Sequence, residues 1–234
     1  MLVVLLGGSP AALSQKLNLP KHKAIIVLDP GHGGNDTGAQ SADGTEEKAV
    51  TLNMARMIAT QLKDDYKVVL TRTDDYWLDI PSRTAMANHQ NASLFISLHA
   101  GGSFLHSAGG ISVFYYENPS ESLLTDKKPA LDSLAETDSP ISWNHLQEKY
   151  LSSSKKLAET IQSQIFKITQ DAESNIQGAA LVVLMGADMP AILIELGYLT
   201  NPNESKALVD PDFLPLMADA ISKGIKAFLS QKSK

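Results

Sequence analysis

Apolar residues in this chain follow two patterns, short runs typical of strands and longer segments with helical spacing. The short runs lie at residues 24–28, 67–71, 93–98, 110–116, 181–184 and 191–194. Apolar residues at intervals of three or four predict helices at 45–62, 81–91 and 211–229, one or two helices within 143–169, and a short helix from about 201. Because strands and helices alternate, the pattern predicts an α/β domain.

The length of the chain favours one domain. Its 234 residues are 43% hydrophobic, which is enough for one sizeable core with at most a small appendage. We expect this domain at residues 24–234. Residues 117–142 interrupt it with a segment rich in Ser, Pro, Asp and Lys that predicts an insertion loop, either a lid that selects substrate or a surface excursion.

Residues 1–23 are predicted to lie outside the domain, as a signal-like segment followed by a polar linker. Residues 2–6 are apolar, and Ala12 and Ser14 are spaced like a small-x-small cleavage site, but no positive charge precedes the run. A remnant of a secretory signal and an extra edge strand are both consistent with this segment. The apolar run is too short to span a bilayer.

Charge and cysteine content narrow the chemistry. The net charge is −6, the pI is near 5.5 and no dense Lys/Arg run occurs, which argues against a broad basic face for nucleic acid or anionic membrane. A neutral or locally recognised substrate fits better. Cysteine is absent, so any metal must be held by imidazole and carboxylate groups.

The sequence DPGHGG at residues 29–34 follows the first apolar run and places His32 at the end of a predicted strand. Open α/β sheets hold their chemistry at such strand ends. Neither spaced-glycine nucleotide fingerprint is present, so the alternatives are a metal-binding or catalytic histidine and a plain polar turn residue. Asp29 is a candidate to orient His32, although a turn-forming role explains it equally well.

Residues 93–102 repeat this design, since an apolar run ends at His99 and glycines follow. Two histidines delivered by two strand ends can meet in space, which favours a shared metal. The remaining histidines lack this setting, and we expect them to be solvated or packed, with His106 the nearest to His99 along the chain. They are His22, His89, His106 and His145.

Acidic residues complete the candidate site. Glu46 and Glu47 fall in the first turn of the predicted helix, where they either complement its dipole or supply one ligand that faces His32. Glu195 directly follows four apolar residues, and an unpaired carboxylate is costly to bury, so it pairs or lines a cleft. Two imidazoles and one carboxylate match an open zinc site, with a second carboxylate free to handle protons.

Five separated segments also carry a family resemblance. They are 28–39 (LDPGHGGNDTGA), 46–62 (EEKAVTLNMARMIATQL), 68–75 (VVLTRTDD), 83–100 (RTAMANHQNASLFISLHA) and 189–205 (MPAILIELGYLTNPNES). In this order they resemble the zinc-dependent N-acetylmuramoyl-L-alanine amidases of the amidase-3 group, cell-wall hydrolases of the AmiC and CwlV types. The resemblance covers about residues 24–229.

The resemblance implies a fold, a site and a substrate. The fold is a single three-layer domain with a mixed, mostly parallel sheet of about six strands flanked by helices. The implied zinc ligands are His32, Glu47 and His99, and Glu195 is the implied catalytic acid. The implied substrate is peptidoglycan, cleaved between the lactyl group of N-acetylmuramic acid and L-alanine, in the periplasm or outside the cell.

Two departures from the family pattern concern substrate contacts more than the metal site. Gly101 and Gly102 stand where the family often has Asn-Ala, and Met185 stands where an arginine commonly follows the leucine. The insertion at 117–142 falls where some relatives carry a regulatory segment. This position leads to the hypothesis that an activator protein regulates the activity. The competing functions are a catalytically silent wall-binding module and a zinc peptidase or deacetylase that acts on another bond.

Overall fold

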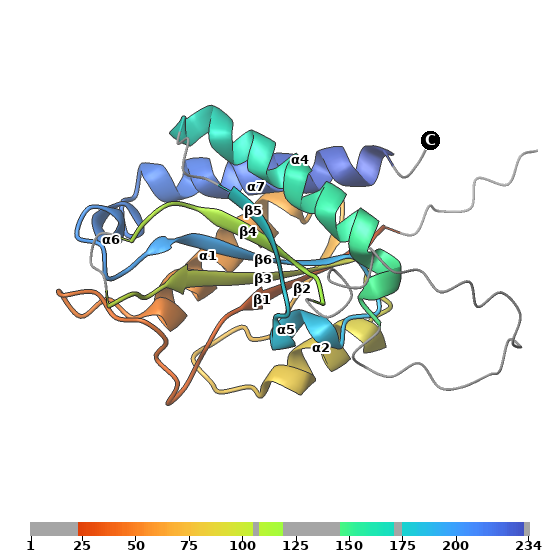
Figure 1. Cartoon of the computed structure of the whole chain (residues 1–234), viewed down its shortest axis with the longest axis horizontal. Coiled ribbons are helices and arrows are strands. Elements are labelled where there is room, and N and C mark those ends of the chain that lie inside the picture. Colours follow the sequence, from red (N-terminus) through yellow and green to blue (C-terminus); the bar gives the residue numbers. More distant parts are fainter. Residues whose placement is uncertain (1–22, 105–107, 119–145, 171–174, 232–234) are drawn as a thin grey trace, which may run out of the picture.

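The computed structural model describes residues 23–104, 108–118, 146–170 and 175–231. These residues form a six-stranded sheet in the order β2-β1-β3-β6-β4-β5, flanked by helices on both faces (Figure 1). The strands are β1 Ile25–Pro30, β2 Lys67–Leu70, β3 Leu94–Gly101, β4 Ser112–Tyr116, β5 Asn175–Ala179 and β6 Ala191–Tyr198. The predicted α/β class and six-stranded sheet are confirmed.

The sheet is mixed and mostly parallel, as the family resemblance implied. β2, β1, β3 and β6 run parallel to one another, whereas β4 runs antiparallel to β6 and parallel to β5. Because β1, β3 and β6 are parallel neighbours, their carboxyl ends meet at one edge of the sheet. This topology brings the ends of three apolar runs, far apart in sequence, to the same place.

Helices cover the two faces unequally (Figure 1). One face is covered by α1 (Glu47–Leu62), α4 (Leu151–Thr169) and α7 (Phe213–Gln231), and the other by α2 (Ile80–His89) and the single-turn α5 (Val182–Met185). The short helices η2 (Glu148–Tyr150) and α6 (Glu204–Ala207) lie in connections. Within the described ranges, no helix has both the length and the apolar character needed to cross a membrane.

Alternating strand residues divide the core between these faces. Ile26 and Leu28 of β1 join the larger core under α1, α4 and α7, whereas Val27 joins the smaller core under α2 and α5. Helices α4 and α7 pack closely at Gly224, where an added Cβ atom would lie 2.6 Å from the Cα atom of Ile161. Glycine is therefore required there by the approach of two backbones.

One strand prediction was wrong. Residues 181–184 were expected to form a strand, but residues 182–185 form α5, and the sheet's edge strand β5 lies earlier, at Asn175–Ala179. The sequence NIQGA is polar and gives no strand signal. Among the described residues β5 pairs with β4 alone, and none of its side chains is buried, so apolar residues are not needed there. Leu184 is buried against the smaller core, so the apolar content of 181–184 reflects packing of a helical turn.

Candidate active site

His32 lies just past the end of β1 in a left-handed conformation that few residues other than glycine adopt. Its φ is +61°, and the neighbouring Gly33 and Gly34 also have positive φ. Gly31 is needed for a different reason, because a Cβ atom there would lie 2.5 Å from the His99 ring. The glycines therefore allow the His32 ring to lie against His99 with 5.1 Å between ring centroids.

Two buried arginines hold the backbone of this loop. Arg72 donates hydrogen bonds to the carbonyl oxygens of Pro30 (3.0 Å) and Gly31 (2.8 Å). Arg83 donates to the carbonyl oxygens of Pro30 (2.8 Å) and His32 (3.0 Å). Three successive carbonyl groups are thus fixed by guanidinium groups, which offsets the strain of the positive φ at His32.

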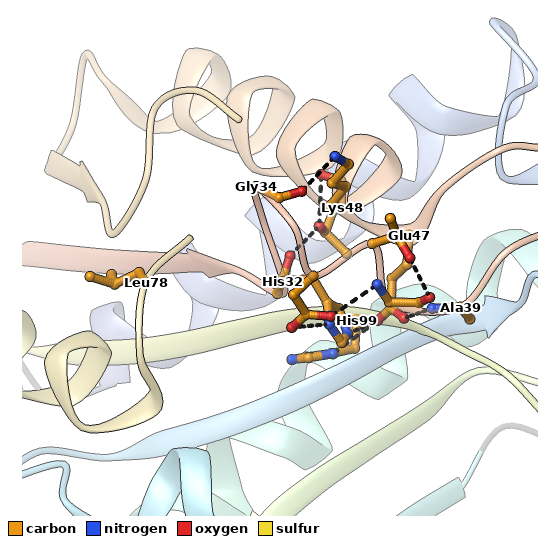
Figure 2. A network of polar contacts seen from close by, with 12 residues as sticks. His32, Gly34, Ala39, Glu47, Lys48, Leu78 and His99 are labelled. Atoms are coloured by element: carbon orange, nitrogen blue, oxygen red, sulfur yellow. Dashed lines mark hydrogen bonds and ion pairs between the residues drawn. The ribbon is translucent and has the colours of Figure 1, made fainter. Parts of the chain in front are cut away.

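Lys48 holds the next part of the same loop. Its Nζ atom donates to the carbonyl oxygen of Gly34 at 2.8 Å (Figure 2). The same Nζ atom pairs with Asp75 at 2.8 Å. Asp75 also accepts a hydrogen bond from the backbone N–H of Gly34 at 2.7 Å. The segment after β2 and the first turn of α1 are therefore tied to the His32 loop.

Glu47, and not Glu46, is the carboxylate that faces His32. Glu47 is buried, and its Oε1 atom lies 3.1 Å from Nε2 of His32 and 2.9 Å from Nδ1 of His99 (Figure 2). Glu46 is the N-cap residue of α1 and instead lies 3.4 Å from Lys48. Glu47 also accepts hydrogen bonds from the backbone N–H groups of Ala39 and Ala100.

The charges in this cluster reinforce one another. Burial opposes ionisation of both His32 and Glu47, but their mutual contact outweighs it. The pKa of His32 is raised by Glu47 and by Asp36, whose Oδ2 atom lies 2.9 Å from Nδ1 of His32. The imidazoles of His32 and His99 hold the pKa of Glu47 well below its usual range, so Glu47 is an anion at neutral pH.

His32, Glu47 and His99 can together hold a metal ion. One ligand atom from each residue lies within 4.8 Å of the other two. Two imidazole nitrogens and a carboxylate oxygen are a donor set that suits zinc, and a three-residue set leaves a coordination position for water. The predicted convergence of these three side chains at one sheet edge is therefore present in the structure.

Glu195 lies beside this triad on β6. It pairs in register with His99 of β3, and its Oε2 atom is buried without a hydrogen-bond partner among the described residues. Burial raises the pKa of Glu195 to about 7, against the opposing effect of His99 and with a contribution from the negative charge of Glu47. A carboxyl group with this pKa can both accept and donate a proton near neutral pH.

Asp29 was a candidate to orient the His32 ring, but its hydrogen bonds go to other residues. It is fully buried and accepts hydrogen bonds from Thr71 (2.6 Å), Ser97 (2.8 Å) and Arg83 (2.9 Å). Its described hydrogen bonds do not include the His32 ring; it fixes Arg83, which in turn fixes the His32 carbonyl group.

Sequence reasoning did not single out three residues that contact the site, Arg72, Arg83 and Asp36. Arg72 and Arg83 gave no sequence signal beyond lying in the segments that resemble the family. Asp36 lies only four residues after His32, and this spacing alone could have marked it. Of the other histidines, His89 is exposed at the end of α2. His22, His106, His145 and most of the predicted insertion at 117–142 fall outside the described residues.

The fold and the site define an α/β domain with an open His–Glu–His centre and the partly buried carboxyl group of Glu195 beside it. Residues 26–227 match the family Amidase_3, described as N-acetylmuramoyl-L-alanine amidase. The chain therefore belongs to this family of amidases, and the predicted family is confirmed. It is 31% identical over 220 residues to the N-acetylmuramoyl-L-alanine amidase AmiA of Escherichia coli K12, a match that covers 88% of this chain and 76% of AmiA.

Solved structures agree with this assignment. The catalytic domain of CwlV, an N-acetylmuramoyl-L-alanine amidase from Bacillus (Paenibacillus) polymyxa var. colistinus, superposes with a TM-score of 0.71 at 28% identity and covers 88% of this chain and 98% of that domain. The CwlD amidase from Clostridioides difficile, solved in complex with the GerS lipoprotein, gives a TM-score of 0.68 at 26% identity and covers 89% of this chain and 99% of that chain.

Proposed function

We propose that this protein is a zinc-dependent hydrolase that cleaves the amide bond between N-acetylmuramic acid and L-alanine in peptidoglycan. In this proposal His32, Glu47 and His99 are the zinc ligands and Glu195 is the catalytic residue. The observation that carries it is the convergence of two imidazoles and one carboxylate within 4.8 Å at the carboxyl edge of the sheet. Membership of the amidase family supports the choice of bond.

The ligand residues and Glu195 have separate tasks. Zinc bound by this donor set lowers the pKa of a water ligand to roughly 7 and polarises a carbonyl group. Glu47 keeps the two imidazoles in place and stays ionised, since its pKa is well below its usual range. Glu195 accepts the proton of the attacking water and delivers it to the nitrogen of the leaving alanine, a task to which its pKa near 7 is suited.

The surrounding chain prepares these groups before substrate arrives. Arg72 and Arg83 hold the loop that carries His32, so the ligand does not have to be ordered by the metal. Glu195 is partly buried, and its Oε2 atom is inaccessible to solvent, which raises its pKa toward neutrality. In this proposal the protein contributes two things to a metal-assisted hydrolysis, orientation of the ligands and proton transfer by Glu195.

Mass analysis of muropeptides tests the bond assignment. Purified cell walls are digested with the zinc-loaded protein, and free stem peptides with an L-alanine amino terminus are expected. Shortened stems still attached to the sugar would identify a peptidase, and unchanged muropeptides would identify a wall-binding module. The matched control is Glu195→Gln, which should retain zinc but lose about 10²-fold to 10⁴-fold in rate; near wild-type activity would refute the role of Glu195.

The substrate implies a location and raises the question of an activator. Peptidoglycan lies outside the cytoplasmic membrane, so we propose a periplasmic or extracellular protein.

The related CwlD amidase was solved with a lipoprotein partner, which supports testing for an activator here. Deletion of residues 117–142 provides the test, because a regulatory segment predicts altered basal activity, whereas equal activity with and without the segment removes the proposal.

A further inference from the structure

The indole ring of Trp77 is exposed beside the His32 loop. Trp77 lies between β2 and α2, and 60% of its surface is accessible. It lines a cavity of about 520 Å³ that also borders His32 and His99 and that we call the Trp77 cavity. A large exposed apolar residue beside a metal-capable centre fits a role in ligand contact better than a role in stability.

The sides of the Trp77 cavity are mainly apolar. The other apolar residues that line it are Leu78, Ile80, Pro81, Leu181, Val182, Val183 and Leu193, the last of which lies on β6. A second cavity of about 490 Å³ shares Ile80, Pro81 and Val182 with the first and extends along Met185. The two cavities therefore adjoin one another beside α2 and α5, which lie side by side in Figure 1, and we call the pair the groove.

Away from the proposed metal centre, the lining residues of the Trp77 cavity offer no unpaired cationic side chain to an anionic ligand. Apart from the two imidazoles, its ionisable lining residues are Asp36, Asp79 and Arg83. Arg83 is buried and is paired with Asp29 at 2.9 Å, so its charge is already neutralised. A stem peptide ends in carboxylate groups, whereas the sugar chain of the substrate is neutral where the lactyl group is joined to the peptide. The groove therefore suits the sugar side better.

The order of residues along the sheet edge assigns a direction to the substrate. Following the strand order β2-β1-β3-β6, this edge carries Trp77 after β2, His32 after β1, His99 on β3 and Glu195 on β6. The metal-capable centre thus lies between Trp77 and Glu195. Because the leaving nitrogen must reach Glu195 to receive a proton, the peptide lies toward β6, and the acyl half of the amide lies toward Trp77.

We propose that the Trp77 cavity binds the muramyl half of the substrate. The indole ring packs against the face of the sugar, the apolar sides receive the lactyl and N-acetyl methyl groups, and the groove along Met185 accommodates the next sugar of the strand. This assignment rests on the proposed amidase function, since it takes the leaving group from the role of Glu195. It identifies Trp77 as a residue that determines substrate specificity.

A binding experiment tests the cavity without requiring turnover. The chain contains two tryptophans, so Trp143→Phe leaves Trp77 as the only one. In the zinc-supplemented Trp143→Phe, Glu195→Gln protein, a disaccharide of N-acetylglucosamine and N-acetylmuramic acid methylamide is expected to shift the fluorescence of Trp77, and a free stem tetrapeptide is not. A peptide response equal to or larger than that of the disaccharide, or no response to either probe, overturns the proposal.

Kinetics provide a second, independent test. Trp77→Ala is expected to lower kcat/KM about tenfold for a muropeptide, and to leave the rate on a sugar-free lactoyl peptide unchanged. Trp77→Phe should restore most of the loss, and Phe166→Ala, which removes another exposed aromatic ring on α4, should have no effect. Equal kcat/KM for wild type and Trp77→Ala on the muropeptide overturns the proposal. If wild type cleaves neither substrate, the amidase function fails, while the fluorescence titration still decides the cavity.

Discussion

Oε1 of Glu47 lies 2.9 Å from Nδ1 of His99, although 52 residues separate them in the chain. The same oxygen atom lies 3.1 Å from Nε2 of His32. Glu47 begins α1, His32 follows β1 and His99 lies near the end of β3, so three elements deliver one ligand atom each. This carboxylate oxygen and the two imidazole rings form the cluster that we propose to bind zinc.

Substitution of Glu47 is expected to weaken zinc binding strongly. Glu47→Gln removes the anionic ligand while it keeps the size of the side chain, and the zinc affinity should fall at least about a hundredfold, as disturbance of metal-site residues typically does. Competition with a chromophoric chelator measures this. Glu46→Gln is the matched control, because Glu46 faces Lys48 and should leave the affinity unchanged. Equal losses in the two variants would contradict the ligand assignment.

Alanine substitutions at Gly38 and Gly44 distinguish the effect of a contact with the site from the effect of backbone strain. Both have positive φ, but a Cβ atom at Gly38 would lie 2.5 Å from Oε2 of Glu47 and 2.6 Å from Cδ2 of His32, whereas one at Gly44 meets nothing within 4 Å. Both alanine variants should lose about 1–2 kcal/mol of stability from the left-handed conformation. Only Gly38→Ala should also weaken zinc binding, which isothermal titration calorimetry can measure.

Loss of Asp29 should destabilise the whole domain. Asp29→Ala leaves the buried guanidinium group of Arg83 without its carboxylate partner and removes acceptors for Thr71 and Ser97. We expect the free energy of unfolding to fall by about 3–5 kcal/mol. Urea denaturation monitored by circular dichroism gives this value. Asp64→Ala, at an exposed site, should change it by less than about 0.5 kcal/mol, and a similarly small change in Asp29→Ala would refute the buried role.

Glu195 should make the metal-free protein less stable as the pH rises. Its folded-state pKa of about 7 lies above the ordinary value of 4.5, so the folded state binds the proton more tightly than the unfolded state. Stability therefore falls as the pH rises from 4.5 to 7, by roughly 3 kcal/mol in total. Glu195→Gln lacks this penalty. Thermal unfolding should show the variant more stable than wild type at pH 8, with the difference vanishing near pH 4; a difference independent of pH would contradict the shifted pKa.

The sequence was sufficient to predict the position of His32, His99 and Glu195. Each follows an apolar run, and parallel strands bring the ends of such runs to one edge of the sheet. Spacing alone left the choice between Glu46 and Glu47 open; the family resemblance implied Glu47, and in the structure Glu47 lies beside both imidazoles. Consecutive helical residues point about 100° apart, so a shift of one residue in the start of α1 decides which carboxylate faces the imidazoles.

Features that depend on tertiary packing could not be predicted. β5 has a polar sequence because it lies at the sheet edge, so apolar content pointed instead to the neighbouring turn that forms α5. Arg72 and Arg83 are charged residues that ordinarily lie at the surface. Their burial follows from the carbonyl groups of the His32 loop, whose orientation depends on the positive φ of His32.

X-ray absorption of the zinc-loaded protein at the zinc edge tests the central claim most directly. We predict one zinc per chain, with two imidazole nitrogen ligands at about 2.0–2.1 Å and oxygen ligands from a carboxylate and water. The His32→Ala, His99→Ala double variant should lose both the imidazole signal and tight zinc binding. A wild-type protein that retains no zinc after dialysis, or a variant that keeps zinc with unchanged imidazole scattering, would contradict a shared metal centre at this edge of the sheet.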